Sequence, residues 1–390
     1  MRGYLKLPLL LLPLLAALTV FVDTPYHRLS TGKLTGVVRV KKLPEPTWET
    51  FYSGAFQAKL EAFLEQEVSF KSVMVRTDNS VNLVAFGDIS GHTGIPIMLG
   101  EQNTLFEMNY VNNTNGVSDI KGDPPPKSPL PTEQEVKRIG RAARAFRALG
   151  KDFLFVMYPS KGWIYRDRLP RRYRLPGGAS RAQAGYEALV RALRAEGVTV
   201  IDGERAFEDL ARSKPDLPLY NRGGTHWTNA GACEVTKLLV SSLSDTGGAK
   251  LICGLGPAAP AHRVDADLAG LINVWDNSRF LDMIPSSEPS LSQPLPGGAR
   301  NALIVGTSFS SHIIEALTTA GVLDDIERMT YYRHGFARKT KWSRVLRNKH
   351  VVIFEQWQWA YVTANISEFM DDLERNDSRY AAAIQADTGK

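Results

Sequence analysis

The stretch "NALIVGTSFSSH", from Asn301 to His312, gives the strongest indication of the fold. Its four consecutive apolar residues, Ala302 to Val305, predict a strand that is buried on both faces. Gly306 and the small polar residues after it are expected to end the strand and begin a helix. Two interpretations of this turn remain open. It either only caps the helix, or it holds the Ser308 hydroxyl at the end of a sheet as a nucleophile.

Other apolar runs have the same character. The segments "DFLFVMY" (152–158), "GVTVID" (197–202) and "HVVIFEQ" (350–356) read as buried strands, and amphipathic helices are expected near 132–146 and 229–243. Buried strands that alternate with such helices predict an α/β fold, a three-layer α/β/α domain with a mostly parallel sheet. Ligands bind beyond the carboxyl ends of the strands in such sheets, so residues that follow strands become candidate site residues.

The N-terminus predicts export. A basic start is followed by "LPLLLLPLLAALTVFV" (Leu7 to Val22), 16 residues without charge. This length lies between a signal-peptide core and a full membrane span. Because no small-residue cleavage site follows Val22, an uncleaved membrane anchor is favoured over a removed signal. Either reading places the rest of the chain outside the cytoplasm.

Composition excludes some classes of protein. The 390 residues are 43% hydrophobic and 23% charged, which is typical of a globular protein, and a net charge of +6 without a recognisable module argues against nucleic-acid binding. The densest basic cluster, 166–174, is either a solvated loop or a contact surface for an anionic polymer or lipid headgroups. Cys233 and Cys253 form a possible disulfide in an oxidising compartment, or remain two buried thiols. A structural metal site is not expected.

The chain is therefore expected to have five parts. They are a membrane anchor or signal segment (1–22), a stalk or linker (23–47), a helical lead-in with a strand pair at 95–110 (48–130), the α/β domain (131–365), and a C-terminal tail (366–390).

A nucleophilic serine needs a base, and His226 is the best placed of the seven histidines. It lies in "YNRGGTHWTNAGA" (220–232), between a glycine turn and a predicted helix start, although a packed loop histidine is the simpler interpretation of this residue alone. The backbone N–H groups of Thr307, Ser308 and Phe309 would lie at the start of a helix, where they suit a developing oxyanion.

Together these segments resemble a known family. "GTSFS" (306–310) and "GTHWTNAGA" (224–232) are similar to the nucleophile and histidine motifs of the SGNH-like alginate O-acetyltransferases, the AlgJ/AlgX family of exopolysaccharide acetylation. That family also places its histidine motif before its serine motif. "PIMLGEQNTLFEMNY" (96–110) and "YPSKGWIY" (158–165) resemble further segments of it, and the likeness covers roughly 48–362. The resemblance implies an SGNH-like fold and acyl transfer.

One position departs from the family pattern, which usually has Asp-x-His-Trp. Gly224 stands where the histidine-orienting aspartate is expected. Three explanations remain open. Asp202 or Glu355 replaces that acid from a neighbouring strand end, a backbone carbonyl orients His226, or the protein has lost catalysis and retains carbohydrate binding.

Several residues are candidates for binding sugar. The aromatic faces of tryptophan suit pyranose rings, and lysine and tyrosine after a strand suit the border of a pocket; the candidates are Trp227, Trp357, Trp359, Lys161 and Tyr165. The alternative for the tryptophans is that they cap the sheet, and for Tyr165 that it packs within the fold.

The resemblance implies an extracytoplasmic polysaccharide O-acetyltransferase, bound to the cell inner membrane on its periplasmic side through the N-terminus. Ser308 would carry the acetyl group and His226 would act as base. The implied partners are a polysaccharide acceptor and a multi-pass membrane acyltransferase that supplies acetyl groups, with no metal or other cofactor. An acetylesterase of the same fold and a non-catalytic carbohydrate-binding scaffold are the alternatives.

Overall fold

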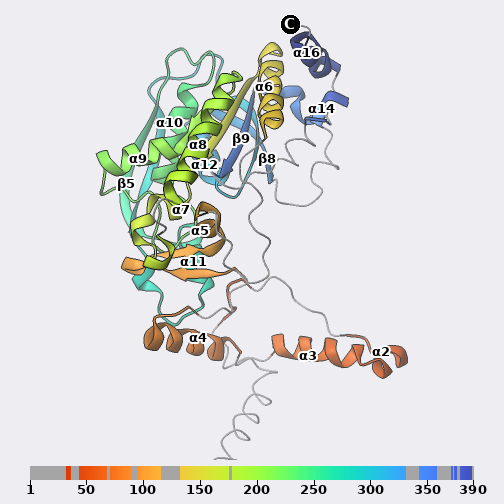
Figure 1. The fold of residues 1–390 in the computed structure, drawn as a ribbon, viewed down its shortest axis with the longest axis vertical. Helices are drawn as coiled ribbons and strands as arrows, with labels where there is room; N and C mark the ends of the chain where they lie inside the picture. The colour runs from red at the N-terminus through yellow and green to blue at the C-terminus, as the bar shows by residue number, and fades with distance from the viewer. Residues whose placement is uncertain are drawn as a thin grey trace, which may run out of the picture.

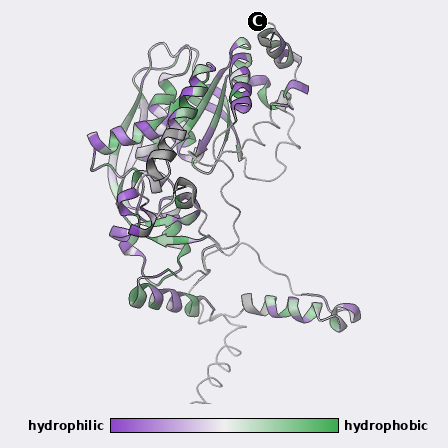
Figure 2. Cartoon of the chain, in the orientation of Figure 1, coloured by the Kyte–Doolittle hydropathy of each residue, from purple (hydrophilic) through white to green (hydrophobic). Residues whose placement is uncertain are grey.

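A computed structural model describes residues 32–36, 44–67, 71–89, 95–115, 132–174, 178–330, 342–357, 370–371, 373–375 and 378–388. The larger part is an α/β domain with helices on both faces of a central sheet, and a smaller region with short strands lies at one end of it (Figure 1). Hydrophobic residues are concentrated on the strands and on the helix faces that pack on them (Figure 2).

The central sheet is parallel throughout, as the apolar runs predict. Its order is β4 (Thr199–Asp202), β3 (Asp152–Tyr158), β9 (Val351–Trp357), β7 (Arg300–Gly306) and β8 (Leu323–Thr330). Every neighbouring pair runs parallel; for example, Val156 of β3 pairs with Glu355 of β9. The carboxyl ends of β7 and β9 therefore meet at one edge of the sheet.

Alternate side chains of these strands enter two different cores. Val156 and Ile304 belong to a core that includes residues of three helices, α9 (Gly203–Ser213), α10 (Asn229–Ser241) and α12 (Ser310–Thr319). Phe155 and Val305 belong to the opposite core, with α6 (Glu133–Ala148) and α8 (Gly178–Ala195). This alternation follows from the two-residue period of a strand, and it confirms a sheet covered on both faces. A capping box begins α6, since Thr132 and Glu135 exchange hydrogen bonds.

The C-terminal segment forms part of the core. Tyr380 on α16 (Ser378–Thr388) is 1% exposed, and its ring lies 5.3 Å from that of Phe146 on α6. Met370 and Leu373 are buried in the same core. The described residues of the expected tail are thus packed onto the α/β domain.

An antiparallel hairpin was not predicted. Its strands are β5 (Leu251–Pro260) and β6 (Met283–Leu291), with an irregularity between Leu255 and Ala258. Four prolines and two glycines in these strands make their sequences resemble loops, but prolines are tolerated on edge strands and at bulges. A disulfide between Cys233 and Cys253 joins β5 to α10. Of the two alternatives for the cysteines, the bonded one is therefore confirmed.

The smaller region contains the predicted strand pair. β1 (Ile97–Leu99) and β2 (Leu105–Glu107) are antiparallel, and α11 (Asp267–Leu271), which lies between β5 and β6 in the chain, packs against β2. Asn79 of α4 (Lys71–Val81) donates a hydrogen bond to the Ile272 carbonyl, which ties α4 to this region.

Shorter elements complete the described chain. They are α2 (Trp48–Tyr52), α3 (Ala55–Glu67), η1 (Asn82–Phe86), η2 (Glu101–Asn103), α5 (Met108–Asn115), α7 (Lys161–Ile164), η3 (Arg166–Arg168), η4 (Arg171–Tyr173), η5 (Arg263–Ala266), η6 (Ser278–Phe280), α14 (Trp342–Val345) and η7 (Leu346–Asn348). None of the helices in the described residues is long and apolar enough to cross a membrane. The expected anchor, 1–22, lies outside those residues.

Candidate active site

The turn after β7 places Ser308 at the carboxyl end of the sheet. Glu355, at the end of the adjacent β9, supports this turn because its carboxylate accepts the Thr307 N–H at 2.6 Å and the Thr307 hydroxyl at 3.0 Å. Gly306 lies directly against the same carboxylate, and a Cβ at that position would overlap it. The strand end, the glycine and the buried glutamate together fix where the Ser308 hydroxyl points.

Glu355 is therefore not the acid that orients the histidine. Its carboxyl group is 1% exposed and is engaged with Thr307. Burial raises the pKa of Glu355 to about 7, while the hydrogen bonds from Thr307 act in the opposite direction. Glu355 therefore holds the turn after β7 in place through its hydrogen bonds with Thr307.

His226 meets Ser308 across 82 positions of sequence. Its Nε2 lies 2.7 Å from the Ser308 Oγ, so the predicted contact between these two side chains is confirmed. Two neighbours hold the histidine loop in place. Thr228 caps α10 by accepting the Gly231 N–H at 3.0 Å, and the Trp227 indole N–H donates to the Phe309 carbonyl at 3.2 Å.

Asp267, at the start of α11, contacts the other ring nitrogen of His226. Its Oδ2 lies 3.0 Å from the His226 Nδ1, and its Oδ1 accepts the backbone N–H groups of Thr225 at 2.8 Å and Leu268 at 2.9 Å. A carboxylate held in this way accepts the Nδ1–H of the imidazole, which leaves Nε2 free to accept the serine proton. Asp267, His226 and Ser308 thus form a connected Asp–His–Ser arrangement.

Asp202 is also excluded as the orienting acid. It caps α9 by accepting the Arg205 N–H at 3.2 Å, and it accepts the Tyr186 hydroxyl at 2.7 Å. Asp202 is therefore a helix cap, and the prediction that Asp202 or Glu355 orients His226 is wrong.

Gly224 has a steric explanation. The backbone carbonyl of Asp265 packs so closely on Gly224 that a Cβ there would overlap it. The segment leading into α11 therefore occupies the space that a side chain at 224 would need. This same segment supplies Asp267, so the carboxylate comes from the connection between β5 and β6 and not from the histidine motif.

Glu107 is a second acidic group near the triad that was not predicted. Its Oε2 accepts the Thr225 hydroxyl at 3.3 Å, and the Thr225 N–H binds Asp267. Burial, followed by the nearby Asp267 charge, raises the pKa of Glu107 to about 7. Its position in β2, within the segment "LFEMNY", was the only available signal.

Of the three backbone N–H groups predicted to bind an oxyanion, two already have hydrogen-bond acceptors in the structure. The Thr307 N–H is used by Glu355, and the Phe309 N–H donates to the Thr307 hydroxyl at 3.1 Å. Within the described chain, the Ser308 N–H has no hydrogen-bond acceptor. Only this group of the three is available to a developing oxyanion.

Three of the predicted sugar-binding residues have structural roles. Trp227 is fully buried, so it cannot stack on a sugar. The Lys161 ammonium is buried and donates to the carbonyls of Leu105, Arg222 and Gly224 at 2.6, 2.8 and 2.7 Å, and burial lowers its pKa to about 7. The Tyr165 hydroxyl donates to the Tyr220 carbonyl at 3.2 Å, which supports the packing alternative.

The remaining two tryptophans stay predictions. The backbone of Trp357 ends β9, beyond Glu355. Trp359 lies outside the described residues.

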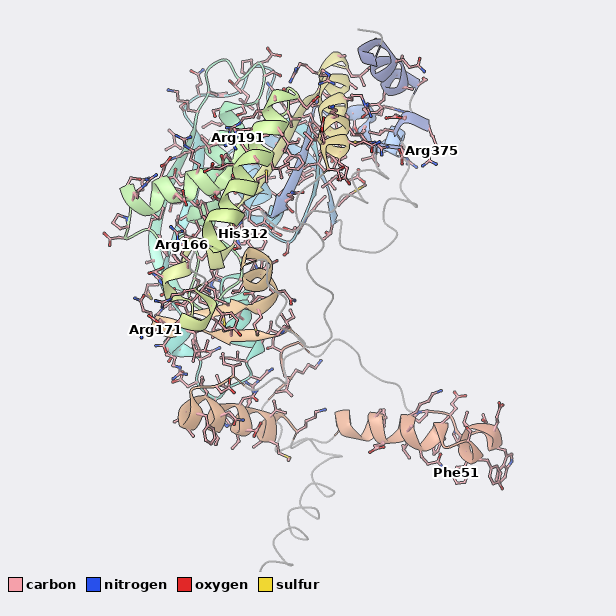
Figure 3. The ribbon with its side chains drawn as sticks, in the orientation of Figure 1. Phe51, Arg166, Arg171, Arg191, His312 and Arg375 are labelled. Atoms are coloured by element: carbon pink, nitrogen blue, oxygen red, sulfur yellow. A yellow bond between two sulfur atoms is a disulfide. The ribbon has the colours of Figure 1, made fainter. Side chains whose placement is uncertain are left out.

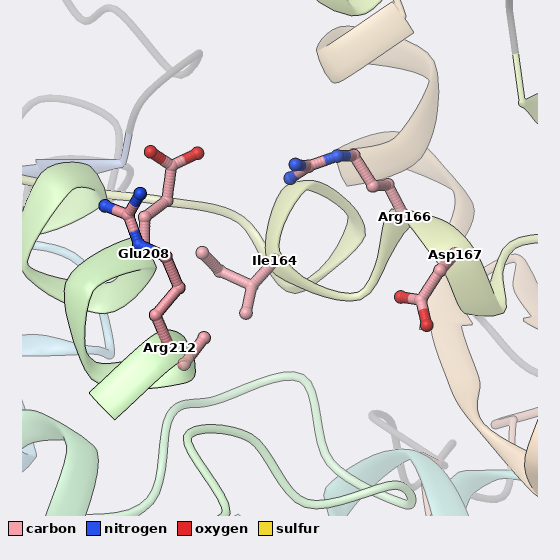
Figure 4. Close-up of a pocket in the computed structure, with 6 residues that line it drawn as sticks. Ile164, Arg166, Asp167, Glu208 and Arg212 are labelled. Atoms are coloured by element: carbon pink, nitrogen blue, oxygen red, sulfur yellow. The ribbon is translucent and has the colours of Figure 1, made fainter. Parts of the chain in front are cut away.

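A charged cavity lies apart from the triad. It has a volume of about 360 Å³ and is lined by Ile164, Arg166, Asp167, Glu208, Ala211 and Arg212. In Figure 4, Arg166 lies on one side of Ile164, and Glu208 and Arg212 lie on the other. The guanidinium of Arg166 also stacks 5.0 Å from the Trp163 ring, so part of the basic cluster packs on the protein itself. Among the described residues, no cluster of three His, Cys, Asp or Glu side chains could hold a metal ion.

A family model and a curated relative match part of the chain. Residues 122–283 match the family model of the SGNH hydrolase-like domain of the acetyltransferase AlgX. The matched segment contains His226 and Asp267 and ends before Ser308. The alginate biosynthesis protein AlgX of Pseudomonas putida is 26% identical over 108 residues, which cover 27% of this chain and only 22% of that relative.

The solved structures found to be similar include two bacterial proteins. The O-acetyltransferase domain of Pseudomonas putida AlgJ has a TM-score of 0.45 at 19% identity and covers 75% of this chain and 99% of its own. AlgX of Pseudomonas aeruginosa has a TM-score of 0.49 at 17% identity and covers 71% of this chain and 67% of its own.

Proposed function

Because the chain belongs to the AlgJ/AlgX family through its SGNH hydrolase-like domain at 122–283, we propose that it transfers acetyl groups to hydroxyls of an extracytoplasmic polysaccharide. The observation that carries the proposal is the continuous contact from Asp267 through His226 to Ser308. This arrangement supplies a nucleophile, a base and an orienting carboxylate.

In the first half of the reaction, His226 accepts the Ser308 proton as the Oγ attacks the acetyl carbonyl carbon. The Ser308 N–H stabilises the resulting oxyanion, and Asp267 stabilises the imidazolium. His226 then returns the proton to the leaving group of the donor. The acetyl group remains as an ester on Ser308.

In the second half, a hydroxyl of the polysaccharide replaces the leaving group. His226 accepts its proton while the sugar oxygen attacks the acetyl-serine carbonyl, and the Ser308 oxygen regains a proton from His226 as it leaves. The product is a sugar acetate and free enzyme. Transfer exceeds hydrolysis only if the bound acceptor excludes water from the ester.

We extend the proposal to location and partners. The disulfide between Cys233 and Cys253 supports an oxidising compartment, and the apolar Leu7–Val22 stretch supports attachment to the inner membrane with the domain on its periplasmic side. A donor must cross the membrane in such a location. A multi-pass acyltransferase is the class of partner that would supply it.

The test uses the full chain with a chromogenic acetyl ester as donor and uronan or glucan oligosaccharides as acceptors. Mass spectrometry of the sugars measures transfer, and released acetate measures hydrolysis. We expect acetylated sugar from the wild type and a loss of roughly 10⁴-fold or more in Ser308→Ala. Ser241→Ala, at the exposed end of α10, is the matched control.

The outcomes separate the candidate functions. Acetate without acetylated sugar would identify an acetylesterase. If neither product forms and Ser308→Ala still binds the oligosaccharide like the wild type, the protein is a non-catalytic scaffold and the proposal fails.

A further inference from the structure

Glu107 is a partly buried acid beside the triad that the proposed mechanism does not use. It ends β2, the second strand of the smaller region. Its Oε2 accepts the hydroxyl of Thr225 at 3.3 Å, and the backbone N–H of the same threonine donates to the Asp267 Oδ1 at 2.8 Å. Thr225, which is 8% exposed, therefore bridges the two carboxyl groups.

The strand that carries Glu107 is fixed against the loop that carries His226. The Leu105 N–H of β2 donates to the Arg222 carbonyl of that loop at 2.8 Å. The Lys161 ammonium joins the same two segments through their backbone carbonyls. The Glu107 carboxyl group therefore has a defined position next to the base of the triad.

The surroundings of Glu107 make it titrate near neutral pH. Burial raises the pKa of Glu107 to about 7, and the charge of Asp267 acts in the same direction, whereas the Thr225 hydroxyl and His226 act in the opposite one. Below this pH the group is mostly neutral, and above it the group adds a negative charge beside the triad. A negative charge there stabilises the imidazolium that forms when His226 accepts the serine proton.

Two other titratable groups face His226 besides Asp267. Asp265 comes from the segment that leads into α11, and burial raises its pKa to about 6. His312 lies on α12, where the α/β domain meets the smaller region (Figure 3), and its ring centroid is 6.2 Å from that of His226. Burial lowers the pKa of His312 to about 4, so this imidazole is neutral over the range in which Glu107 titrates.

The elements that pack on β2 supply few further charges. Arg222 of the histidine loop is paired with Asp282 at 2.6 Å. Lys161 of α7 donates to three carbonyls, and burial lowers its pKa to about 7. The sequences of β1 and α5 contain no charged residue. All these groups are unchanged when only Glu107 is replaced, so a comparison of the wild type with such a variant isolates the Glu107 charge.

We propose that Glu107 is a positioning residue that acts on the triad through Thr225 and, once it has lost its proton, stabilises the imidazolium of His226 by its charge. The inference rests on the proposed function and adds a second acid to the base of the same site. The neutral carboxyl group holds the threonine bridge, and the ionised group strengthens the base as well. Turnover should therefore rise further as Glu107 ionises.

Kinetics at two pH values separate this role from a structural one. The kcat for cleavage of the chromogenic acetyl ester is measured near pH 6 and near pH 8. Glu107→Gln keeps an oxygen that can accept the Thr225 hydroxyl but carries no charge. We expect this variant to match the wild type within about twofold at the lower pH and to be roughly three- to tenfold slower at the higher pH. Glu107→Leu, which also removes the acceptor, should be slower at both.

Glu101→Gln is the matched control. Glu101 is an exposed acid that precedes the same strand, and its carboxylate pairs with Arg174. This variant should keep the wild-type rate at both pH values. If Glu107→Gln instead loses rate equally at both and has a lower melting temperature, Glu107 only stabilises the fold and the inference fails. An unchanged rate at the higher pH would also overturn it.

Carboxyl NMR keeps this inference separate from the proposed function. In chains with isotope-labelled glutamate, the Glu107 signal is assigned by its absence in Glu107→Gln and is followed through a pH titration without any ester. We expect a midpoint at about 7 that falls by roughly one pH unit in Asp267→Asn, because the neighbouring charge is removed. A midpoint at the ordinary value of 4.5, or one that Asp267→Asn leaves unchanged, would reject the coupling. A wild type that shows this coupling but no ester cleavage that depends on Ser308 would instead contradict the proposed function.

Discussion

The parallel sheet and the β5–β6 hairpin contribute to the triad in different ways. The sheet places Ser308 at the end of β7 and supports it with Glu355 at the end of β9, which is where an α/β fold is expected to place reactive groups. The hairpin contributes Asp267 from the connection between its strands. The position of the nucleophile therefore follows from the architecture, whereas the source of the carboxylate depends on an additional segment.

The comparison also explains why a glycine is tolerated in the histidine motif. With Asp267 supplied by the hairpin connection, a carboxylate two residues before His226 is not needed for the contact at Nδ1. The Asp265 carbonyl then packs on Gly224. This chain thus keeps an Asp–His–Ser arrangement although the residue two positions before the histidine is a glycine.

The largest effect should come from removing the carboxylate of the hairpin region. Asp267→Asn should lower kcat by about 10³- to 10⁴-fold, because an amide at this position favours the wrong imidazole tautomer. Steady-state kinetics with the chromogenic ester measure the change. Asp202→Asn, which changes the α9 cap and the contact with the Tyr186 hydroxyl, should retain kcat; if both variants behave alike, Asp267 has no special relation to His226.

The second effect concerns attachment of the hairpin. Replacing both cysteines, Cys233→Ser with Cys253→Ser, should lower the free energy of unfolding by about 3 kcal/mol, the chain-entropy value for a loop of about 20 residues. Denaturant titration measures it. The wild type should lose the same stability when reductant is added, and the variant should not respond to reductant. A variant as stable as the oxidised wild type would show that the bond contributes nothing.

Gly224→Asp tests whether the acid can return to the histidine motif. The new Cβ would overlap the Asp265 carbonyl, so we expect displacement of the hairpin connection, a loss of about 1–3 kcal/mol in stability and a lower kcat. Thermal unfolding and ester hydrolysis measure both. Gly270→Ala, whose Cβ would meet nothing closer than 3.7 Å, is the matched control. Recovery of activity when Gly224→Asp is added to Asp267→Asn would contradict this expectation.

The smallest effect is on the pH dependence of stability. It comes from Glu355, which lies at the end of β9 in the central sheet. Glu355 has a pKa of about 7 when folded and an ordinary value of 4.5 when unfolded. Between these values the folded chain keeps a proton that the unfolded chain releases, so the free energy of unfolding falls as pH rises. Glu355→Gln should make this slope shallower in melting curves between pH 4.5 and 7.

Part of the slope should remain in Glu355→Gln. The pKa of Glu107 is also about 7, and that of Asp265 is about 6, so both carboxyl groups act with the same sign in this window. An unchanged slope in the variant would show that Glu355 does not titrate there.

The strands and the Ser308–His226 contact could be predicted because their signals are local. Each strand is a continuous apolar run, and both residues lie in turns of small residues beside a helix start. Asp267 could not be predicted because no local motif marks it and its surroundings, strands rich in proline and glycine, resemble a loop. Pairing of those strands depends on the tertiary fold, which the pattern of residues does not record.

Burial was the other property that the sequence did not show. Trp227 and Lys161 have the side chains of a sugar-binding site, yet one is fully buried and the other binds three backbone carbonyls. The same residue types serve both roles. Only the packing of the loops around them distinguishes the two.

Lys161 links two parts of the molecule that lie far apart in the sequence. Its ammonium connects the Leu105 carbonyl of β2 to two carbonyls of the loop that carries His226. The β1–β2 pair and the loop that carries His226 therefore share one buried cation. A chain shortened past Leu105 should therefore lose one of the contacts that hold this loop in place, while the contacts of Asp267, Trp227 and Thr228 remain.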